Sequence, residues 1–94
     1  MIGESLLSQN HSQNYIINIE KNQLLGLVLE FDPVSKSYIV DEIINEKLRN
    51  EINIGDYLVK INDIDISNYN TSELSNLCKK LMKKKKVLEF VYRY

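Results

Sequence analysis

The sequence predicts an α+β fold: a small, mostly antiparallel sheet of five to six strands, folded as a sandwich or open barrel and capped by two helices. Three observations predict it. Short segments rich in β-branched residues are separated by turn residues. One amphipathic segment follows near the C-terminal end, and a further strand-like segment comes after it. The chain of 94 residues fits a single domain.

The first half of the chain contains three predicted strands. Tyr15–Glu20 is short and β-branched, which is typical of a strand. Leu27–Phe31 alternates in polarity, as a half-buried strand does. Asp32–Pro33 opens a turn, because proline fixes φ and has no N–H to donate to a ladder. Ser37–Ile44 is the third strand.

The middle of the chain predicts a short helix and a hairpin. Asn45–Glu51 has few strand-forming residues, and Leu48 is the apolar anchor of the helix expected there. Tyr57–Ile61 alternates again and predicts a strand. Asn62–Asp63 fits a two-residue hairpin turn, since Asn and Asp tolerate positive φ, and Ile64–Ile66 is the short return strand.

The clearest helix follows this hairpin. Asn70 and Thr71 are both suitable N-caps, and Glu73 places negative charge in the first turn, where the helix dipole favours it. Val87–Tyr92 is the closing strand. The apolar residues of the helix recur at helical spacing and form one stripe, made of Leu74, Leu77, Cys78 and Leu81.

The composition indicates an ordinary globular domain with a polar N-terminal tail. Hydrophobic residues make up 44% of the chain and charged residues 27%. Residues 1–13 are rich in Ser, Gln and Asn, so we expect a flexible tail there and the folded domain in residues 14–94. No apolar run approaches the roughly 20 residues of a membrane helix. We expect a cytoplasmic protein, or a piece of a larger one.

The residue inventory argues against an enzyme. Cys78 is the single cysteine, so an internal disulfide and a cysteine metal cluster are excluded. Its place on an apolar helix face is typical of a small buried hydrophobe. His11, the single histidine, lies in the expected tail. The sequence therefore predicts no catalytic residues, no metal, no cofactor and no small-molecule substrate.

Two stretches together resemble a known family. Leu24–Leu27 (Leu-Leu-Gly-Leu), between the first two strands, resembles the Gly-Leu-Gly-Phe carboxylate loop of PDZ domains. Ile54–Ile66 resembles the Gly-Asp-x-Leu-x-x-Val-Asn-Gly-Val-Asp-Leu run of the same family. The resemblance covers residues 14–94. The chain departs from the pattern where Leu24 replaces the first glycine of the loop and Asp63 replaces the hairpin glycine.

The resemblance implies a module that binds the C-terminal peptide of another protein. The backbone amides of Leu25, Gly26 and Leu27 would receive the terminal carboxylate of the peptide in a small anion-binding concavity. Gly26 would be needed because a side chain would crowd the ligand or forbid the backbone angles. The peptide would then add to the edge of Leu27–Phe31 as an extra strand. Without the second stretch, Leu24–Leu27 would be interpreted as the core-facing start of a strand.

The resemblance also implies a groove between the second strand and the main helix. The expected occupant of its pocket is an aliphatic last residue of the peptide. Thr71, or Asn70 if the register differs by one, would meet the third residue from the peptide end, and its hydroxyl and methyl leave the ligand class open. Leu81 is either the floor of the pocket or part of the core. The expected groove residues are Val28, Leu29, Thr71, Ser75, Cys78 and Leu81.

The charge distribution gives an alternative function. Residues 1–78 carry a net charge of −7, whereas residues 79–94 carry +6. The basic end is either a solvated helix end or a functional surface, which would contact anionic membrane lipids or an acidic partner, or serve in assembly. Nucleic acid is not an expected partner, because no aromatic residues lie between the lysines. This basic patch consists of Lys79, Lys80, Lys83, Lys84, Lys85 and Lys86.

Overall fold

The computed structural model describes residues 14–92, and its order of elements matches the predicted one. The expected tail of residues 1–13 lies outside the described residues. Most boundaries fall within one residue of the predicted ones. The elements are β1 (Asn14–Ile19), β2 (Leu27–Asp32), β3 (Ser37–Ile43), η1 (Glu46–Leu48), β4 (Tyr57–Ile61), β5 (Ile64–Asp65), α2 (Thr71–Leu81) and β6 (Lys86–Val91).

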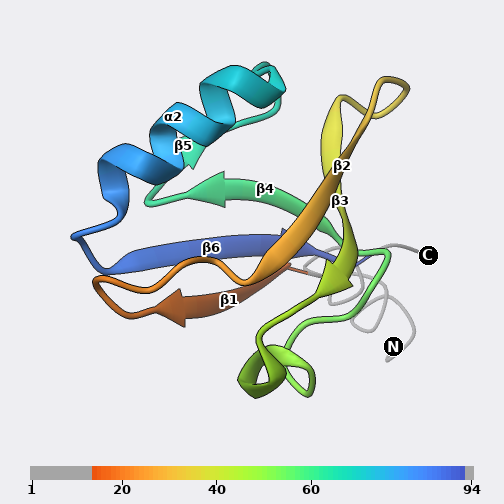
Figure 1. Cartoon of the computed structure of the whole chain (residues 1–94). Helices are drawn as coiled ribbons and strands as arrows, with labels where there is room; N and C mark the ends of the chain where they lie inside the picture. The colour runs from red at the N-terminus through yellow and green to blue at the C-terminus, as the bar shows by residue number, and fades with distance from the viewer. Residues whose placement is uncertain (1–13, 93–94) are drawn as a thin grey trace, which may run out of the picture.

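The six strands form one antiparallel sheet that is strongly bent (Figure 1). The order along the sheet is β1-β6-β4-β3-β2, and β5 pairs with β4. β1 and β2 are consecutive in sequence, yet they lie at opposite ends of this path. β2 therefore pairs with β3 on one side only within residues 14–92. The predicted fold class is confirmed.

The core lies between the inner face of the sheet and α2. The stripe predicted from helical spacing packs into it, with Leu74, Leu77 and Leu81 all buried. Each of the longer sheet strands except β2 contributes fully buried or nearly buried residues, whereas the side chains of β2 are half-buried or exposed. The largest fully buried apolar side chains are Tyr38, Ile52, Leu58, Ile61, Ile66, Leu88 and Phe90.

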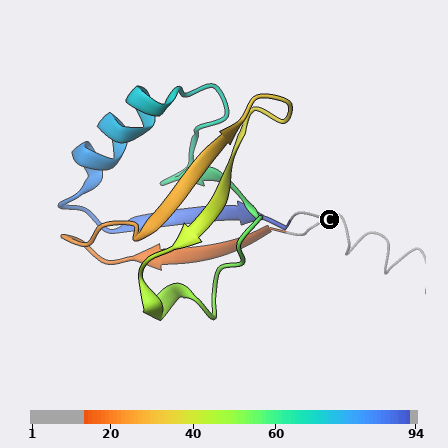
Figure 2. The same cartoon turned by 45° about the vertical axis from the view of Figure 1, so that its right-hand side comes forward.

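The start of α2 is fixed by a capping box. The Asn70 side chain accepts a hydrogen bond from the Glu73 amide at 2.8 Å, and the Glu73 carboxylate accepts one from the Asn70 amide at 2.9 Å. Asn70 is therefore the N-cap, and Thr71 is the first helical residue. Figure 2 shows α2 facing β2, with the start of the helix at the same end as the β2–β3 turn.

The first of the two predicted helices is only one turn of 3₁₀ helix, which corrects the expectation of a second capping helix. Asn45 caps it, with its side-chain oxygen accepting from the Lys47 amide at 3.0 Å. Leu48 is buried, as predicted for the anchor. One apolar anchor makes no helical stripe, so packing supports no second turn.

The β4–β5 hairpin has the predicted two-residue turn. Asn62 and Asp63 have φ values of 50° and 66°, as a type I′ turn requires. The Asn62 side chain also accepts a hydrogen bond from the Val87 amide at 2.6 Å, which ties the turn to β6.

Candidate functional site

Within residues 14–92, no strand pairs with the outer edge of β2, which leaves that edge open to a further strand. Gly26, just before β2, accepts hydrogen bonds through its carbonyl from the amides of Ile44 at 2.8 Å and Asn45 at 3.1 Å. Along a strand of an antiparallel sheet, the backbone N–H and C=O groups of successive residues point alternately toward one neighbouring strand and toward the other. The N–H and C=O groups of Leu27 and Leu29 therefore point away from β3, toward the unpaired side.

The loop before β2 carries amides that its own chain does not use. Within residues 14–92, the N–H groups of Leu25 and Gly26 donate to no backbone or side-chain acceptor. Gly26 has a φ of +68°, in the left-handed region that glycine adopts without strain. Successive amides in a turn of this kind form a concavity suited to an anion. Carboxylate binding by Leu25, Gly26 and Leu27 is a prediction that this geometry permits.

The requirement for glycine has a cause that sequence reasoning missed. A Cβ placed on Gly26 would come within 2.5 Å of the Asn45 Cβ and 3.3 Å of the Asn45 amide nitrogen. The sequence predicted that a side chain would crowd the ligand or forbid the backbone angles, and the positive φ agrees with the second reason. The steric conflict found in addition is with Asn45, the cap of η1. Glycine is thus required at position 26 both by the backbone angle and by the side chain of Asn45.

A groove of about 450 Å³ runs between β2 and α2. It begins at the loop around Gly26 and continues along the inner side of β2. No charged side chain lines it, so it suits an uncharged, largely apolar occupant. Its lining residues are Leu24, Leu25, Gly26, Leu27, Leu29, Tyr38, Ile44, Thr71, Leu74, Ser75 and Cys78.

Comparison with solved structures identifies the fold. A PDZ domain from choanoflagellate GIPC matches with a TM-score of 0.69 at 19% identity, over 86% of this chain and 91% of that one. INAD PDZ3, solved in complex with a TRP channel tail, matches with a TM-score of 0.71 at 11% identity, over 94% of this chain and 95% of that one. The chain has a PDZ fold.

The likeness is one of structure. No family model and no curated protein sequence matches the chain. The choanoflagellate GIPC domain has also been solved bound to a GAIP peptide, and that structure matches this chain equally well, with a TM-score of 0.69. At identities of 11% and 19%, the comparison with these two domains shows the PDZ fold and does not by itself assign a ligand to this chain.

The PDZ fold brings together most of the predicted groove residues. Leu29, Thr71, Ser75 and Cys78 line the groove from its two walls. Val28 does not line it, because successive side chains of a strand point to opposite faces. The lining residues that sequence reasoning missed are Leu24, Tyr38, Ile44 and Leu74.

Leu81 and Cys78 differ in their place relative to the groove. Leu81 is buried and belongs to the core, which is the second of the two alternatives predicted for it. Cys78 is half-buried and lines the groove. Burial raises the pKa of the Cys78 thiol, so the side chain remains a neutral, largely apolar part of the wall.

The predicted basic patch loses one of its six members. Lys86 is 2% exposed and begins β6, one residue earlier than predicted. Its ammonium lies within hydrogen-bonding distance of four carbonyl oxygens, at 2.9 to 3.4 Å, belonging to Glu20, Leu81, Met82 and Lys84. It closes the C-terminal end of α2 from inside, as a cation does favourably at that end of the dipole. The exposed lysines are Lys79, Lys80, Lys83, Lys84 and Lys85.

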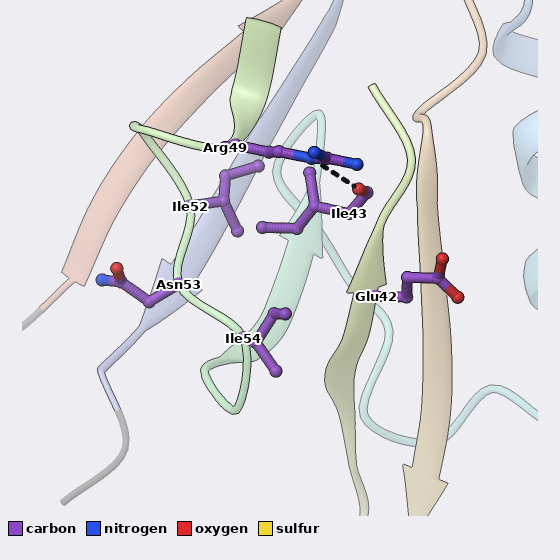
Figure 3. A pocket seen from close by; sticks show the side chains of 6 residues that line it. All are labelled: Glu42, Ile43, Arg49, Ile52, Asn53 and Ile54. Carbon is purple, nitrogen blue, oxygen red and sulfur yellow. Dashed lines mark hydrogen bonds between the residues drawn. The ribbon is translucent and has the colours of Figure 1, made fainter. Parts of the chain in front are cut away.

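A second hollow of about 470 Å³ lies between the end of β3 and the loop that leads from η1 to β4 (Figure 3). The Arg49 side chain crosses it, with its Nε donating to the Ile43 carbonyl at 3.3 Å. Ile52 and Ile54 point toward the same space. It shares no lining residue with the groove.

Two further classes of site find no basis in the described residues. No group of three or more His, Cys, Asp or Glu side chains in residues 14–92 is arranged to hold a metal ion. In the same range, no helix combines the length and the apolar character that a membrane span requires.

Proposed function

We propose that this PDZ-fold domain is a non-enzymatic interaction module that binds the C-terminal peptide of a partner protein by strand addition. The observation that carries the proposal is the coincidence of three features at one place. The edge of β2 is open, the amides of Leu25 and Gly26 have no acceptor within residues 14–92, and an uncharged groove begins beside them.

Each feature would meet a different part of the ligand. The terminal carboxylate would accept hydrogen bonds from the amides of the loop. The last side chain would enter the apolar part of the groove, where Leu25, Leu27 and Cys78 favour an aliphatic residue such as Val, Leu or Ile. The ligand backbone would bond to the outward groups of Leu27 and Leu29.

The start of α2 would meet the third residue from the ligand end. Thr71 and Ser75 offer hydroxyl groups, and Thr71 also offers a methyl group, so both polar and aliphatic residues are compatible there. The solved GIPC and INAD domains, whose structures contain a GAIP peptide and a TRP channel tail, support peptide binding as the use of this groove.

The proposal is tested with matched peptides. A library of free C-terminal heptapeptides, read by fluorescence anisotropy, should yield ligands with dissociation constants near 1 μM, about −8 kcal/mol. Amidating the C-terminus of a selected peptide should weaken its binding at least about tenfold, because the charge that meets the loop amides is removed. Equal affinity for the acid and the amide would refute the carboxylate mechanism.

Salt distinguishes this proposal from the alternative of a basic patch acting on anionic lipids. Groove binding should persist between about 0.1 and 0.5 M salt, since it relies on main-chain bonds and apolar contact. Binding through the exposed lysines to anionic vesicles should collapse in the same range, because the screening length falls below about 10 Å. The exclusion of Lys86 from the surface reduces that patch, and no feature of the described residues adds support for it.

A further inference from the structure

A hollow of about 530 Å³ adjoins the groove near the start of α2. Thr71 lines both, so the two spaces meet at that residue. The hollow is lined by residues of the β2–β3 turn and of the loop that leads into α2. Figure 2 shows these two segments at the same end of β2 and α2. The lining residues are Phe31, Pro33, Lys36, Ser67, Asn68, Tyr69, Asn70 and Thr71.

The register of an added strand decides which ligand residue reaches this hollow. A ligand whose carboxylate meets the loop around Gly26 runs antiparallel to β2. Its last residue then lies beside Leu27, the third from the end beside Leu29, and the fifth from the end beside Phe31. Four residues of strand span about 13 Å. Directly opposed residues of an antiparallel pair place their side chains on the same face, so the fifth ligand side chain lies next to the Phe31 ring.

The walls of the hollow are held in place without a ligand. The Tyr38 hydroxyl donates to the Tyr69 carbonyl at 2.7 Å and so ties β3 to the loop before α2. The ring of Tyr38 also contacts that of Phe31, with centroids 5.2 Å apart.

The β2–β3 turn is closed by its own hydrogen bonds. The Asp32 carbonyl accepts from the Lys36 amide at 2.7 Å. The Asp32 carboxylate accepts from the Val34 amide at 3.1 Å and from the Ser35 hydroxyl at 2.9 Å. A ligand side chain entering the hollow therefore orders little of the protein, which favours binding.

Two aromatic rings and a proline in the lining favour a large apolar side chain in the hollow, whereas the remaining lining residues, among them Lys36, are polar. Phe31 is 37% exposed, the one β2 side chain among the exposed large hydrophobic residues of the described chain. Tyr69 is half-buried and faces the same space, and Pro33 adds an apolar ring. Covering these rings removes apolar surface from water, and aromatic pairs gain beyond the area they bury.

We propose that this hollow is an upstream subsite that selects a large apolar side chain, aromatic or aliphatic, at the fifth position from the ligand C-terminus. The proposal rests on the proposed function, because strand addition along β2 sets the register. It extends recognition beyond the last three residues of the ligand, and Phe31 is its specificity-determining residue.

The test uses a free-acid heptapeptide selected for binding and three versions of it, with Ala, Leu or Phe at the fifth position from the end. The wild type should bind the Leu and Phe versions about tenfold more tightly than the Ala version. Phe31→Ala should abolish this preference while still binding the Ala version. Val34→Ala is the matched control, because Val34 lies in the same turn, is 91% exposed and does not line the hollow. It should keep the full preference.

The outcomes separate the subsite from the function. Peptides that bind with no preference at the fifth position would overturn the subsite and leave strand addition standing. A preference that survives Phe31→Ala would also overturn it, since the side chain would then bind elsewhere. Equal binding of acid and amide versions would overturn the proposed function, and the subsite with it. Thermal unfolding checks that each variant folds, and Phe31→Thr, which keeps a strand-forming residue, replaces Phe31→Ala if that variant does not.

Discussion

Gly26, the last residue before β2, is in contact with Asn45. The Gly26 carbonyl accepts the Asn45 amide at 3.1 Å, and a Cβ on Gly26 would lie 2.5 Å from the Asn45 Cβ. Asn45 also caps η1 through its side chain. The one-turn helix after β3 therefore helps to set the conformation of the loop that we propose as the receptor of a ligand carboxylate.

Gly26→Ala should cost more stability than Gly55→Ala. Both glycines have positive φ, +68° and +97°, so an alanine at either position is strained by about 1–2 kcal/mol. Only Gly26 has a neighbour in the way, since nothing lies within 4 Å of a Cβ on Gly55. Denaturant unfolding of both variants measures the difference. Equal losses of unfolding free energy would mean that Asn45 moves aside at little cost.

The same pair of variants should differ in ligand binding. Displacing Asn45 shifts the Gly26 carbonyl and the amides beside it, so Gly26→Ala should lose most of its peptide affinity. Gly55→Ala changes a turn away from the groove and should bind within about twofold of the wild type. Full affinity in folded Gly26→Ala would contradict a role for this loop.

Ser75→Phe should block the groove without unfolding the domain. Ser75 is exposed on α2 and lines the groove, so a ring there occupies the space of the ligand. Peptide affinity should fall at least about tenfold, with stability within about 0.5 kcal/mol of the wild type. Ser72→Phe is the control, because Ser72 is exposed on the same helix but lines no part of the groove. Similar affinities for the two variants would place the ligand elsewhere.

Lys86→Met should destabilise the domain although it removes one of many lysines. The substitution keeps an apolar stem of similar length but leaves several carbonyl oxygens at the end of α2 without their buried donor. The expected loss is about 1–3 kcal/mol in urea unfolding. Lys83→Met, on the exposed surface, should change stability by less than about 0.5 kcal/mol. An unfolding free energy unchanged by Lys86→Met would show that solvent replaces the ammonium without cost.

Tyr15→Phe should weaken the domain and alter its alkaline unfolding. The Tyr15 hydroxyl donates to the Asp56 carboxylate at 2.6 Å, so its removal should cost about 2 kcal/mol. Burial, and then this hydrogen bond, raises the pKa of Tyr15 above its usual range. The folded state thus holds the proton more tightly than the unfolded state, whose tyrosine pKa is about 10.

The pH dependence follows from that difference. The contribution of Tyr15 is fully present below about pH 10 and is lost as the pH rises above it, because the unfolded state then binds fewer protons. Unfolding free energies measured between pH 8 and pH 11 should therefore fall less steeply in Tyr15→Phe than in the wild type. Some slope should remain, since burial also raises the pKa of Tyr38. Identical slopes would contradict the assignment to Tyr15.

The local patterns of the sequence were sufficient for the strands and the main helix. Alternation located Tyr57–Ile61 without error, and the tolerance of Asn62 and Asp63 for positive φ gave the hairpin turn. The stripe beginning at Leu74 gave the buried face of α2. These features depend on neighbours within a few residues, which a single sequence displays.

The features that local patterns missed depend on long-range contacts. The close approach of Gly26 and Asn45 brings together residues that are far apart along the chain, and the pattern around Gly26 gives no sign of it. In the sequence, Lys86 is one more lysine in a basic run and was predicted to be exposed. In the structure it begins β6, and its side chain is buried against the C-terminal end of α2. Tyr38 has no sequence signal that would place it in the groove wall, because its place there depends on how β3 pairs with β2 and packs beside α2.

An open margin on β2 also affects how the protein behaves in concentrated samples. Along the six residues of β2, the backbone N–H and C=O groups that point away from β3 can pair with any extended chain, including β2 of a second molecule. The strand is short, and the exposed Glu30 places like charges near one another when two such margins meet. These two features oppose pairing of the edges but do not cover them. A saturating peptide that occupies the edge of β2 should stabilise the domain and delay any remaining self-association during purification and crystallisation.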